Sequence, residues 1–157
     1  MKTSHIYPGA QTVSAYLTFK DCKKAIEFYK KAFGATEKGV LYTPDGKVGH
    51  AEIEIEGTLI MLADENPDWD NKSVETFKGS PCNFGLYVKD ADASFKKAVE
   101  AGAKEVMKVE DMFYGDRTGS VMDPFGFKWM ISTHKEDVGF SEMQKRFDKM
   151  FEEQAKN

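Results

Sequence analysis

The chain has 157 residues, the length of one ordinary domain or two very small ones. Hydrophobic residues make up 41% of it and charged residues 31%, proportions that are typical of globular proteins and exclude wholesale disorder. The 22 Lys and Arg residues are outnumbered by 26 Asp and Glu residues, and the net charge of −4 excludes a generic basic surface for nucleic acid.

The sequence shows no segment typical of membrane insertion or secretion. No apolar run approaches the ~20 residues that a membrane-spanning helix needs. The first sixteen residues lack the apolar core of a signal peptide. Two cysteines, Cys22 and Cys82, are too few for a disulfide scaffold. We therefore expect a soluble, reduced, cytoplasmic protein that binds neither membranes nor nucleic acid.

The first half of the chain predicts a strand, a helix and three further strands. Apolar and polar residues alternate over residues 15–19, which is typical of a half-buried strand. A helix then begins at the capping residue Asp21 and ends at Gly34. The three strands that follow are expected at Val40–Tyr42, Val48–Ile55 and Leu59–Leu62.

The second half repeats this order. A strand at residues 84–88 leads to a helix that begins at Asp90 and ends at Gly102. Turns at Tyr114–Arg117 and Asp123–Gly126 separate the last strands, and the second turn is interpreted as structural. The three strands are expected at Val106–Val109, Gly119–Met122 and Phe127–Ser132.

An offset of 69 residues aligns the two halves. Residues 14–21 then lie on residues 83–90, so that Leu17 matches Leu86, and Gly57–Met61 lies on Gly126–Met130. The same features recur in the same order, which indicates a duplicated βαβββ unit. The expected fold class is α+β, with tandem modules that form curved, partly closed mixed sheets.

The expected boundaries define a single domain over residues 1–157. Module one spans about 12–63, a polar joining loop 64–81, and module two about 82–134. A C-terminal helix is expected at about 141–155, because Ser141 and Gln144 fit a capping box. Its apolar face most simply covers a sheet or a dimer seam, and its mixed polar face argues against membrane binding.

Several stretches together resemble a known family. They are Tyr16–Phe19, Ala25–Ala35, His50–Glu52, Phe113–Arg117, Asp123–Gly126 with Trp129, and Thr133–Asp137. The chain resembles the vicinal-oxygen-chelate superfamily of glyoxalase I, extradiol dioxygenases and bleomycin-resistance proteins, and within it the PhnB-like branch, over roughly residues 12–140. The resemblance implies edge-to-edge modules whose sheets enclose a cavity, usually in a homodimer.

The resemblance also locates the metal ligands of the metal-dependent members, which are typically His or Gln, Glu, His and Glu. Those positions fall here at Ser14, Met61, Asn83 and Met130. Hard divalent ions prefer carboxylate or imidazole ligands, and thioethers are soft. We therefore expect no glyoxalase-type metal centre and no cofactor, although a divalent metal at a shifted site stays an alternative.

His50 and Glu52 are the candidate catalytic residues. Strand alternation places them on one face, opposite the core positions Ala51 and Ile53. A histidine beside a carboxylate could act as an oriented general base or as half of an unconventional metal site. The alternative is a hydrogen-bonded histidine on a half-exposed strand, with Glu52 on a solvated face.

The candidate ligand-binding residues are polar, aromatic or thioether side chains that the resemblance places on the concave faces or in neighbouring loops. Arg117 could clamp a carboxylate or phosphate, or could pair with Asp116 or Asp123 in a turn. Trp69 in the joining loop could close over a ligand, but it and Phe77 are slightly more expected to pack against the modules. The full set is Tyr16, Met61, Trp69, Asn83, Tyr87, Tyr114, Arg117 and Met130.

Three functions remain open from the sequence. The first is a metal-independent protein that binds a small aromatic or amphipathic ligand in a cavity. The second is a lyase, isomerase or dioxygenase-like enzyme that uses His50 and Glu52. The third is a dimeric interaction module without small-molecule chemistry. Cys22 on the apolar helix face is expected to be buried and inert, and nothing beside Cys82 indicates a nucleophile.

Overall fold

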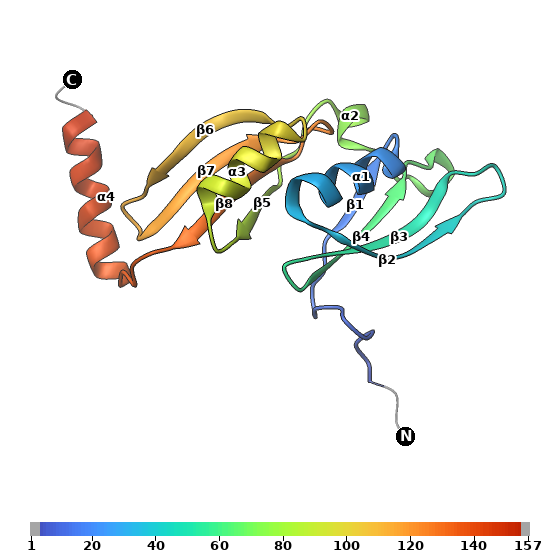
Figure 1. The fold of residues 1–157 in the computed structure, drawn as a ribbon, viewed down its shortest axis with the longest axis horizontal. Helices are drawn as coiled ribbons and strands as arrows, with labels where there is room; N and C mark the ends of the chain where they lie inside the picture. Colours follow the sequence, from blue (N-terminus) through green and yellow to red (C-terminus); the bar gives the residue numbers. More distant parts are fainter. Residues whose placement is uncertain (1–3, 155–157) are drawn as a thin grey trace.

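The computed structural model describes residues 4–154, which form two βαβββ modules followed by a C-terminal helix (Figure 1). Each module has its own mixed four-stranded sheet, and the sheets do not close into a barrel. The predicted α+β class is therefore confirmed. The elements are β1 Tyr16–Phe19, α1 Cys22–Phe33, β2 Thr36–Tyr42, β3 Val48–Ile55, β4 Thr58–Asp64, the short helix η1 Pro67–Trp69, α2 Val74–Phe77, β5 Asn83–Tyr87, α3 Ala91–Glu100, β6 Lys104–Asp111, β7 Asp116–Met122, β8 Lys128–His134 and α4 Phe140–Gln154.

The two sheets share one topology, as the repeat predicts. The strand order is β1-β4-β3-β2 in the first and β5-β8-β7-β6 in the second. The first strand of each module runs parallel to the last, and the other neighbours are antiparallel. The edge strands β1 and β5 belong to different sheets and border the junction between the modules.

Both long helices of the modules begin in the predicted way. The carboxylate of Asp21 accepts a hydrogen bond from the backbone N–H of Lys24 at 3.1 Å, and Asp90 accepts one from Ala93 at 3.0 Å. These bonds satisfy amide groups that the first helical turn leaves without partners. Gly34 ends α1 in the left-handed conformation that a glycine adopts without strain.

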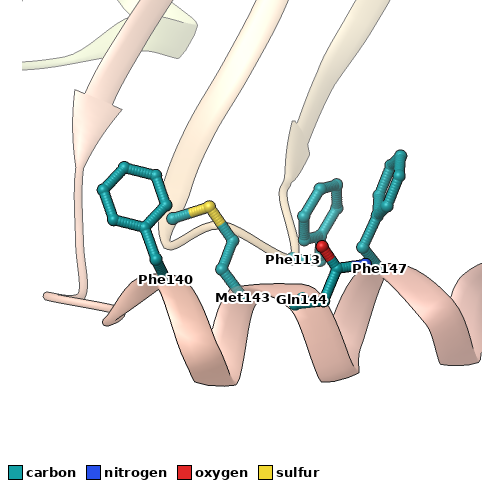
Figure 2. Close-up of a pocket in the computed structure, with 5 residues that line it drawn as sticks. All are labelled: Phe113, Phe140, Met143, Gln144 and Phe147. Carbon is teal, nitrogen blue, oxygen red and sulfur yellow. The ribbon is translucent and has the colours of Figure 1, made fainter.

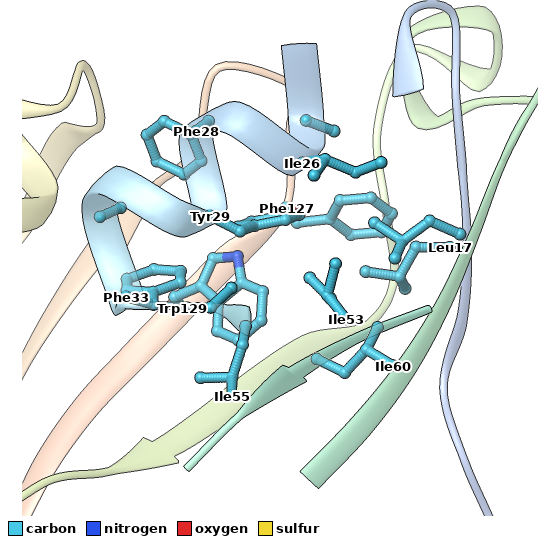
Figure 3. Close-up of a cluster of buried hydrophobic side chains, with 14 of the residues drawn as sticks. Leu17, Ile26, Phe28, Tyr29, Phe33, Ile53, Ile55, Ile60, Phe127 and Trp129 are labelled. Atoms are coloured by element: carbon cyan, nitrogen blue, oxygen red, sulfur yellow. The ribbon is translucent and has the colours of Figure 1, made fainter. Parts of the chain in front are cut away.

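One apolar core runs through both modules (Figure 3). Helix α1 contacts its own sheet and α3, and its aromatic side chains reach the last strand of the second module. The ring centroids of Phe33 and Trp129 lie 4.7 Å apart, and those of Tyr29 and Trp129 lie 5.5 Å apart. Because Tyr29 and Trp129 are buried, this contact ties the modules together.

Several expected boundaries were too narrow. Strand β2 begins at Thr36, β6 spans Lys104–Asp111, and β7 begins at Asp116, inside the predicted turn. The joining loop contains η1 and α2. Paired strands continue as far as backbone hydrogen bonds can form, and these can extend beyond the apolar alternation that marks a strand in the sequence.

The C-terminal helix also differs from its expectation. It begins at Phe140, so Ser141 lies inside the helix and forms no capping box with Gln144, whose amide donates to Asp148 instead. The expected end at residue 155 lies outside the described residues. In Figure 1, α4 stands at the far end of the second module and covers neither sheet of the described chain. Within residues 4–154, no helix combines the length and apolar character required to cross a membrane.

Candidate ligand-binding site

The first sheet has one face covered by α1 and one open face, and strand register assembles the candidate residues on the open face. Tyr16 on β1 lies beside Met61 on β4, which in turn lies beside Glu52 on β3. The intervening residues Ala51 and Ile53 are completely buried on the other face. The alternation predicted for this strand is therefore confirmed, and it brings Tyr16, Glu52 and Met61 together.

A chain of hydrogen bonds links the polar groups on this face. The Tyr16 hydroxyl lies 3.2 Å from Nδ1 of His50, and Nε2 of His50 lies 3.4 Å from Oε1 of Glu52. The side chains of His50 and Glu52 are 29% and 17% exposed. In the tautomer that donates from Nε2 to the Glu52 carboxylate, which only accepts, Nδ1 of His50 accepts the Tyr16 proton.

Tyr16 is the member of this chain that solvent or a ligand reaches most readily. Its side chain is 48% exposed, and its ring lies 5.7 Å from the His50 ring. Partial burial raises the pKa of Tyr16 above its ordinary value, so the hydroxyl stays protonated at neutral pH. With its proton directed at His50, the oxygen can accept a hydrogen bond from a ligand donor.

An apolar hollow of about 340 Å³ adjoins Tyr16 along the free edge of β1. It lies between β1, the joining segment and the start of the second module. A hollow of this size matches the lower range of small-molecule sites, which are mostly apolar with a few polar groups. Its lining includes Ala15, Tyr16, Leu17, Thr18, Val74, Phe77, Phe84 and Phe127.

The second sheet presents Asn83, Tyr87 and Met130 on its own open face. Met130 lies beside Gly85 on β5 and Ser120 on β7 in the strand register. Asn83, Tyr87 and Met130 are exposed, whereas Ser120 is buried. These three candidate residues therefore share a face with one another, on a different sheet from Tyr16 and His50.

A polar network on this second face was not predicted. The Tyr87 hydroxyl donates to Asp116 at 2.6 Å, and the other oxygen of Asp116 lies 2.7 Å from Nδ1 of His134. Nε2 of His134 lies 2.9 Å from Asp137. These hydrogen bonds to Asp116 and Asp137 raise the pKa of His134. The sequence pattern that could have indicated this network is the alternation along β7, because it places Asp116 on the same face as Ser120.

Arg117 lies on the opposite face of β7, toward α3. Its guanidinium binds Asp92 through two hydrogen bonds of 2.6 and 2.7 Å and reaches Asp111 at 3.2 Å. The prediction that Arg117 pairs with Asp116 or Asp123 is therefore wrong. The ion pair lowers the pKa of Asp92. Arg117 is therefore engaged by two carboxylates of its own chain and lies on neither open face.

The remaining candidates lie away from both open faces. Tyr114 stacks edge-on against Phe113 beside α4, with ring centroids 5.2 Å apart. Trp69 borders a separate hollow next to the β2–β3 turn. The expectation that Trp69 and Phe77 pack against the modules is wrong, since each is 66% exposed. Phe77 nevertheless lines the apolar hollow beside Tyr16.

Asp123 begins the turn interpreted as structural, and its contacts agree with that role. Its buried carboxylate accepts from the Tyr29 hydroxyl at 2.7 Å and from the Trp129 indole at 3.0 Å. Backbone amides of Phe125 and Phe127 complete its hydrogen bonds. Burial nevertheless raises the pKa of Asp123. The turn thus joins the second module to α1.

The two cysteines differ in the expected way. Cys22 is completely buried, and this burial raises the pKa of its thiol to about 12. A thiol with such a pKa stays protonated and is a poor nucleophile. Cys82 is exposed and free, and lies at the edge of the apolar hollow.

Comparison with known proteins places this geometry in a family. The family model of the Glyoxalase/Bleomycin resistance protein/Dioxygenase superfamily matches residues 10–131. The chain belongs to this superfamily. The match covers the first module and the second as far as Ile131 within β8, and it excludes α4.

Individual relatives extend the comparison. An uncharacterised protein of Mycobacterium bovis is 41% identical over 135 residues, which cover 84% of this chain and 89% of the relative. The X-ray structure of an Arabidopsis thaliana gene product is 33% identical, with a TM-score of 0.63, over 78% of this chain and 98% of the other. A PhnB protein from Bacillus cereus shares the fold at 14% identity and a TM-score of 0.61, over 78% of this chain and 99% of the other.

The superfamily's metal site can be tested against the side chains found here. Met61 lies between Tyr16 and Glu52 in the sheet register, and Met130 lies between Gly85 and Ser120. Their thioethers stand where metal-dependent members place carboxylates, and a hard divalent ion binds thioethers poorly. The two methionines therefore do not fit such an ion.

Proposed function

We propose that this superfamily member binds a small aromatic or amphipathic molecule beside Tyr16, without coordinating it to a metal. The observation that carries the proposal is the apolar hollow of about 340 Å³ along β1, next to the hydrogen-bonded chain of Tyr16, His50 and Glu52. The hollow supplies apolar contact area and the Tyr16 hydroxyl supplies a directional polar contact. This combination is typical of small-molecule sites.

The geometry also favours a class of ligand. An aromatic ring fits between Phe77, Phe84 and the Tyr16 ring, which all line the hollow. The Tyr16 oxygen accepts a hydrogen bond, because its own proton is directed at His50. We therefore expect a planar molecule that carries a hydroxyl or amine donor at one edge.

The binding experiment starts with protein dialysed against a chelator. A panel of aromatic antibiotics and small aromatic carboxylates is screened by thermal shift, and hits are titrated by calorimetry against wild type, Tyr16→Ala and the control Tyr42→Ala. Tyr42 is an exposed tyrosine outside the hollow. Loss of a stacking and hydrogen-bonding partner should weaken binding by about tenfold or more in Tyr16→Ala alone.

Three outcomes would refute the binding proposal. They are no hit in the panel, equal affinity for wild type and Tyr16→Ala, or binding that requires added divalent metal. Equal weakening in Tyr42→Ala would show a nonspecific effect and would also count against it.

The same hydrogen-bond chain favours a second candidate, an enzyme that moves a proton. Tyr16 would receive a proton from a bound substrate while passing its own to Nδ1 of His50, and Glu52 would orient the imidazole through Nε2. On an identified substrate, His50→Gln should abolish turnover without changing the melting temperature. Turnover that survives in His50→Gln would leave His50 a structural residue and would reject the enzyme.

A further inference from the structure

The second module has a glycine in the middle of its edge strand β5, and the described chain does not require a glycine there. The pairing of β5 with β8 runs from Asn83 to Tyr87 without a shift in register. The backbone of Gly85 lies outside the left-handed region, and a Cβ atom there would meet nothing within 4 Å. A glycine inside a regular strand weakens it and often marks a place where a ligand or another backbone approaches closely.

Two other strand glycines have structural reasons. Gly119 on β7 lies beneath α3, where a Cβ atom would come within 2.8 Å of the Phe95 ring. Gly39 on β2 lies at a shift in strand register. Gly85 shows neither feature, and the matching repeat position of the first module holds the large side chain of Tyr16. The missing side chain at Gly85 therefore leaves the space beside β5 open.

That space is a hollow of about 300 Å³ between the free edge of β5 and the turn from β3 to β4. Its size matches the lower end of the range of small-molecule clefts, and most of its lining is apolar, as in Ile60, Phe84 and Trp129. The hollow shares Phe84 with the one beside Tyr16. Tyr16 itself lines only the first hollow, and Gly85 lines only the second.

The free edge of β5 brings backbone polar groups to this hollow. The Val88 amide donates to the carbonyl of Ser132 on β8 at 2.8 Å. Successive residues of a strand point their N–H and C=O groups to opposite sides, so those of Gly85 face away from β8, toward the free edge. They present one donor and one acceptor side by side, in a place where no side chain keeps a ligand at a distance. An amide or lactam group has the complementary pair.

The side chains around the hollow favour further donor groups on a ligand. The Tyr87 hydroxyl donates its proton to Asp116 at 2.6 Å, so its oxygen is left to accept a hydrogen bond. Glu56, at the turn from β3 to β4, also lines the hollow, and its carboxylate accepts. The Phe84 ring offers a surface on which a planar ring can pack.

The hollow beside α4 lacks these features. It measures about 190 Å³, below the range of roughly 300–1,000 Å³ that is typical of small-molecule clefts. It lies between α4 and the turn from β6 to β7, and its lining is apolar except for one amide side chain. Figure 2 shows the residues that line it, which are Phe113, Phe140, Met143, Gln144 and Phe147.

We propose that the hollow at Gly85 is a second binding site, which takes a planar aromatic molecule with an amide or lactam edge. The amide edge pairs with the N–H and C=O groups of Gly85, and the ring packs on Phe84. A further donor on the ligand is directed at Tyr87 or Glu56. The site does not depend on the one proposed beside Tyr16, because the two hollows present different polar groups.

The first test titrates isotope-labelled full-length protein with benzamide and with the lactam pyridone, and follows the backbone amide resonances. The Gly85 amide should shift in a saturable way with both probes. Methyl benzoate keeps the ring and the carbonyl but lacks the N–H donor, so it should bind about tenfold more weakly. No saturable shift at Gly85 with either amide probe, or equal affinity for methyl benzoate, would overturn the proposal.

The second test fills the hollow with a side chain. Gly85→Val should raise the dissociation constant of benzamide by about tenfold or more, while its melting temperature rises because valine suits a strand better than glycine. Gly39→Val is the matched control, since Gly39 lies in an edge strand outside the hollow and a Cβ atom there also has open space. Unchanged benzamide binding in Gly85→Val, or an equal loss in Gly39→Val, would contradict a site at Gly85.

The last test separates this site from the proposed function and from a contact between copies of the chain. Tyr16→Ala should leave the benzamide affinity at Gly85 unchanged. A loss of benzamide binding in Tyr16→Ala would show that the two hollows form one site, which would refute the second site and leave the proposed function standing. A shift of the Gly85 resonance when the protein is diluted without a probe would show that another copy covers the edge, and would also overturn the inference.

Discussion

The two modules share one topology but fill their cores differently. Helix α1 buries four large residues, Ile26, Phe28, Tyr29 and Phe33, together with Cys22 and two alanines, whereas α3 buries Ala91 and Ala98. At one repeat position, the first module has Ile60 and the second has Trp129, which reaches Tyr29 and Phe33 of α1. The comparison teaches that the second module completes its core with the helix of the first.

The polar groups on the two open faces have different hydrogen-bond partners. On the second sheet, polar groups satisfy one another, because Thr118 pairs with Ser132 at 2.9 Å and Tyr87 closes over Asp116. On the first sheet, the exposed Tyr16 contacts His50 and adjoins an apolar hollow, just as Tyr87 adjoins a hollow of about 300 Å³ on the second. Duplication thus provided two matched faces that differ mainly in the partner of the exposed tyrosine, which is His50 for Tyr16 and Asp116 for Tyr87.

The largest expected effect comes from the aromatic contact between the modules. Trp129→Ala should lower the free energy of unfolding by about 3–5 kcal/mol, because it empties a buried aromatic site and removes the contact with α1. Ile60→Val at the matching repeat position should cost only about 1 kcal/mol. Urea denaturation followed by circular dichroism measures both, and equal losses would contradict the dependence of the second core on α1.

The buried hydroxyl of Tyr29 should have the next largest effect. Tyr29→Phe removes the donor to Asp123 and leaves that buried carboxylate with fewer partners, which should cost about 1–3 kcal/mol. Tyr42→Phe at an exposed site is the matched control and should leave stability unchanged. A Tyr29→Phe protein as stable as wild type would show that this hydrogen bond does not fasten the modules.

The helix caps should reveal where the two modules are equivalent. Asp21→Ala and Asp90→Ala each remove one side-chain acceptor at the start of a helix, and each should cost about 1 kcal/mol. The same denaturation assay applies to both variants. Caps that differ by much more than the error would show that the two helix starts are unequal despite their matched geometry.

The sequence predicted features that depend on local periodicity. Alternation along β3 placed His50 and Glu52 opposite Ala51 and Ile53, and it correctly separated a polar face from the core. The capping aspartates were found because a helix start needs an acceptor within three residues. Both predictions depend only on residues that are neighbours in the chain, and the structure confirms both.

Features that depend on distant partners were not found. Tyr29 and Asp123 are 94 residues apart, and no periodicity links them. One alternative paired Arg117 with acidic residues near it in sequence, but its guanidinium binds Asp92 on α3, which lies 25 residues away and on the same face of the sheet. Alternation states which face a side chain occupies and leaves open what packs against that face.

The smallest expected effect lies at the end of the last strand of each module. Glu65 and His134 occupy the same repeat position, and each holds the segment that follows it. Glu65 accepts from the Thr76 hydroxyl at 2.6 Å and from the Ser73 amide at 3.0 Å, and the first of these bonds is the main cause of its lowered pKa. His134 is held mainly by Asp116, and its pKa is raised.

The two residues should therefore depend on pH with opposite signs. Stabilisation by Glu65 is complete above its ordinary pKa of 4.5 and is lost as the pH falls through the lowered value in the folded chain. Stabilisation by His134 is complete below 6.5 and is lost as the pH rises through its raised folded value. Melting temperatures from pH 3 to 9 should show that Glu65→Gln approaches wild type only in acid and His134→Gln only in alkali. Each variant is the control for the other, and two losses of stability that grow in the same direction of pH would contradict the assigned contacts.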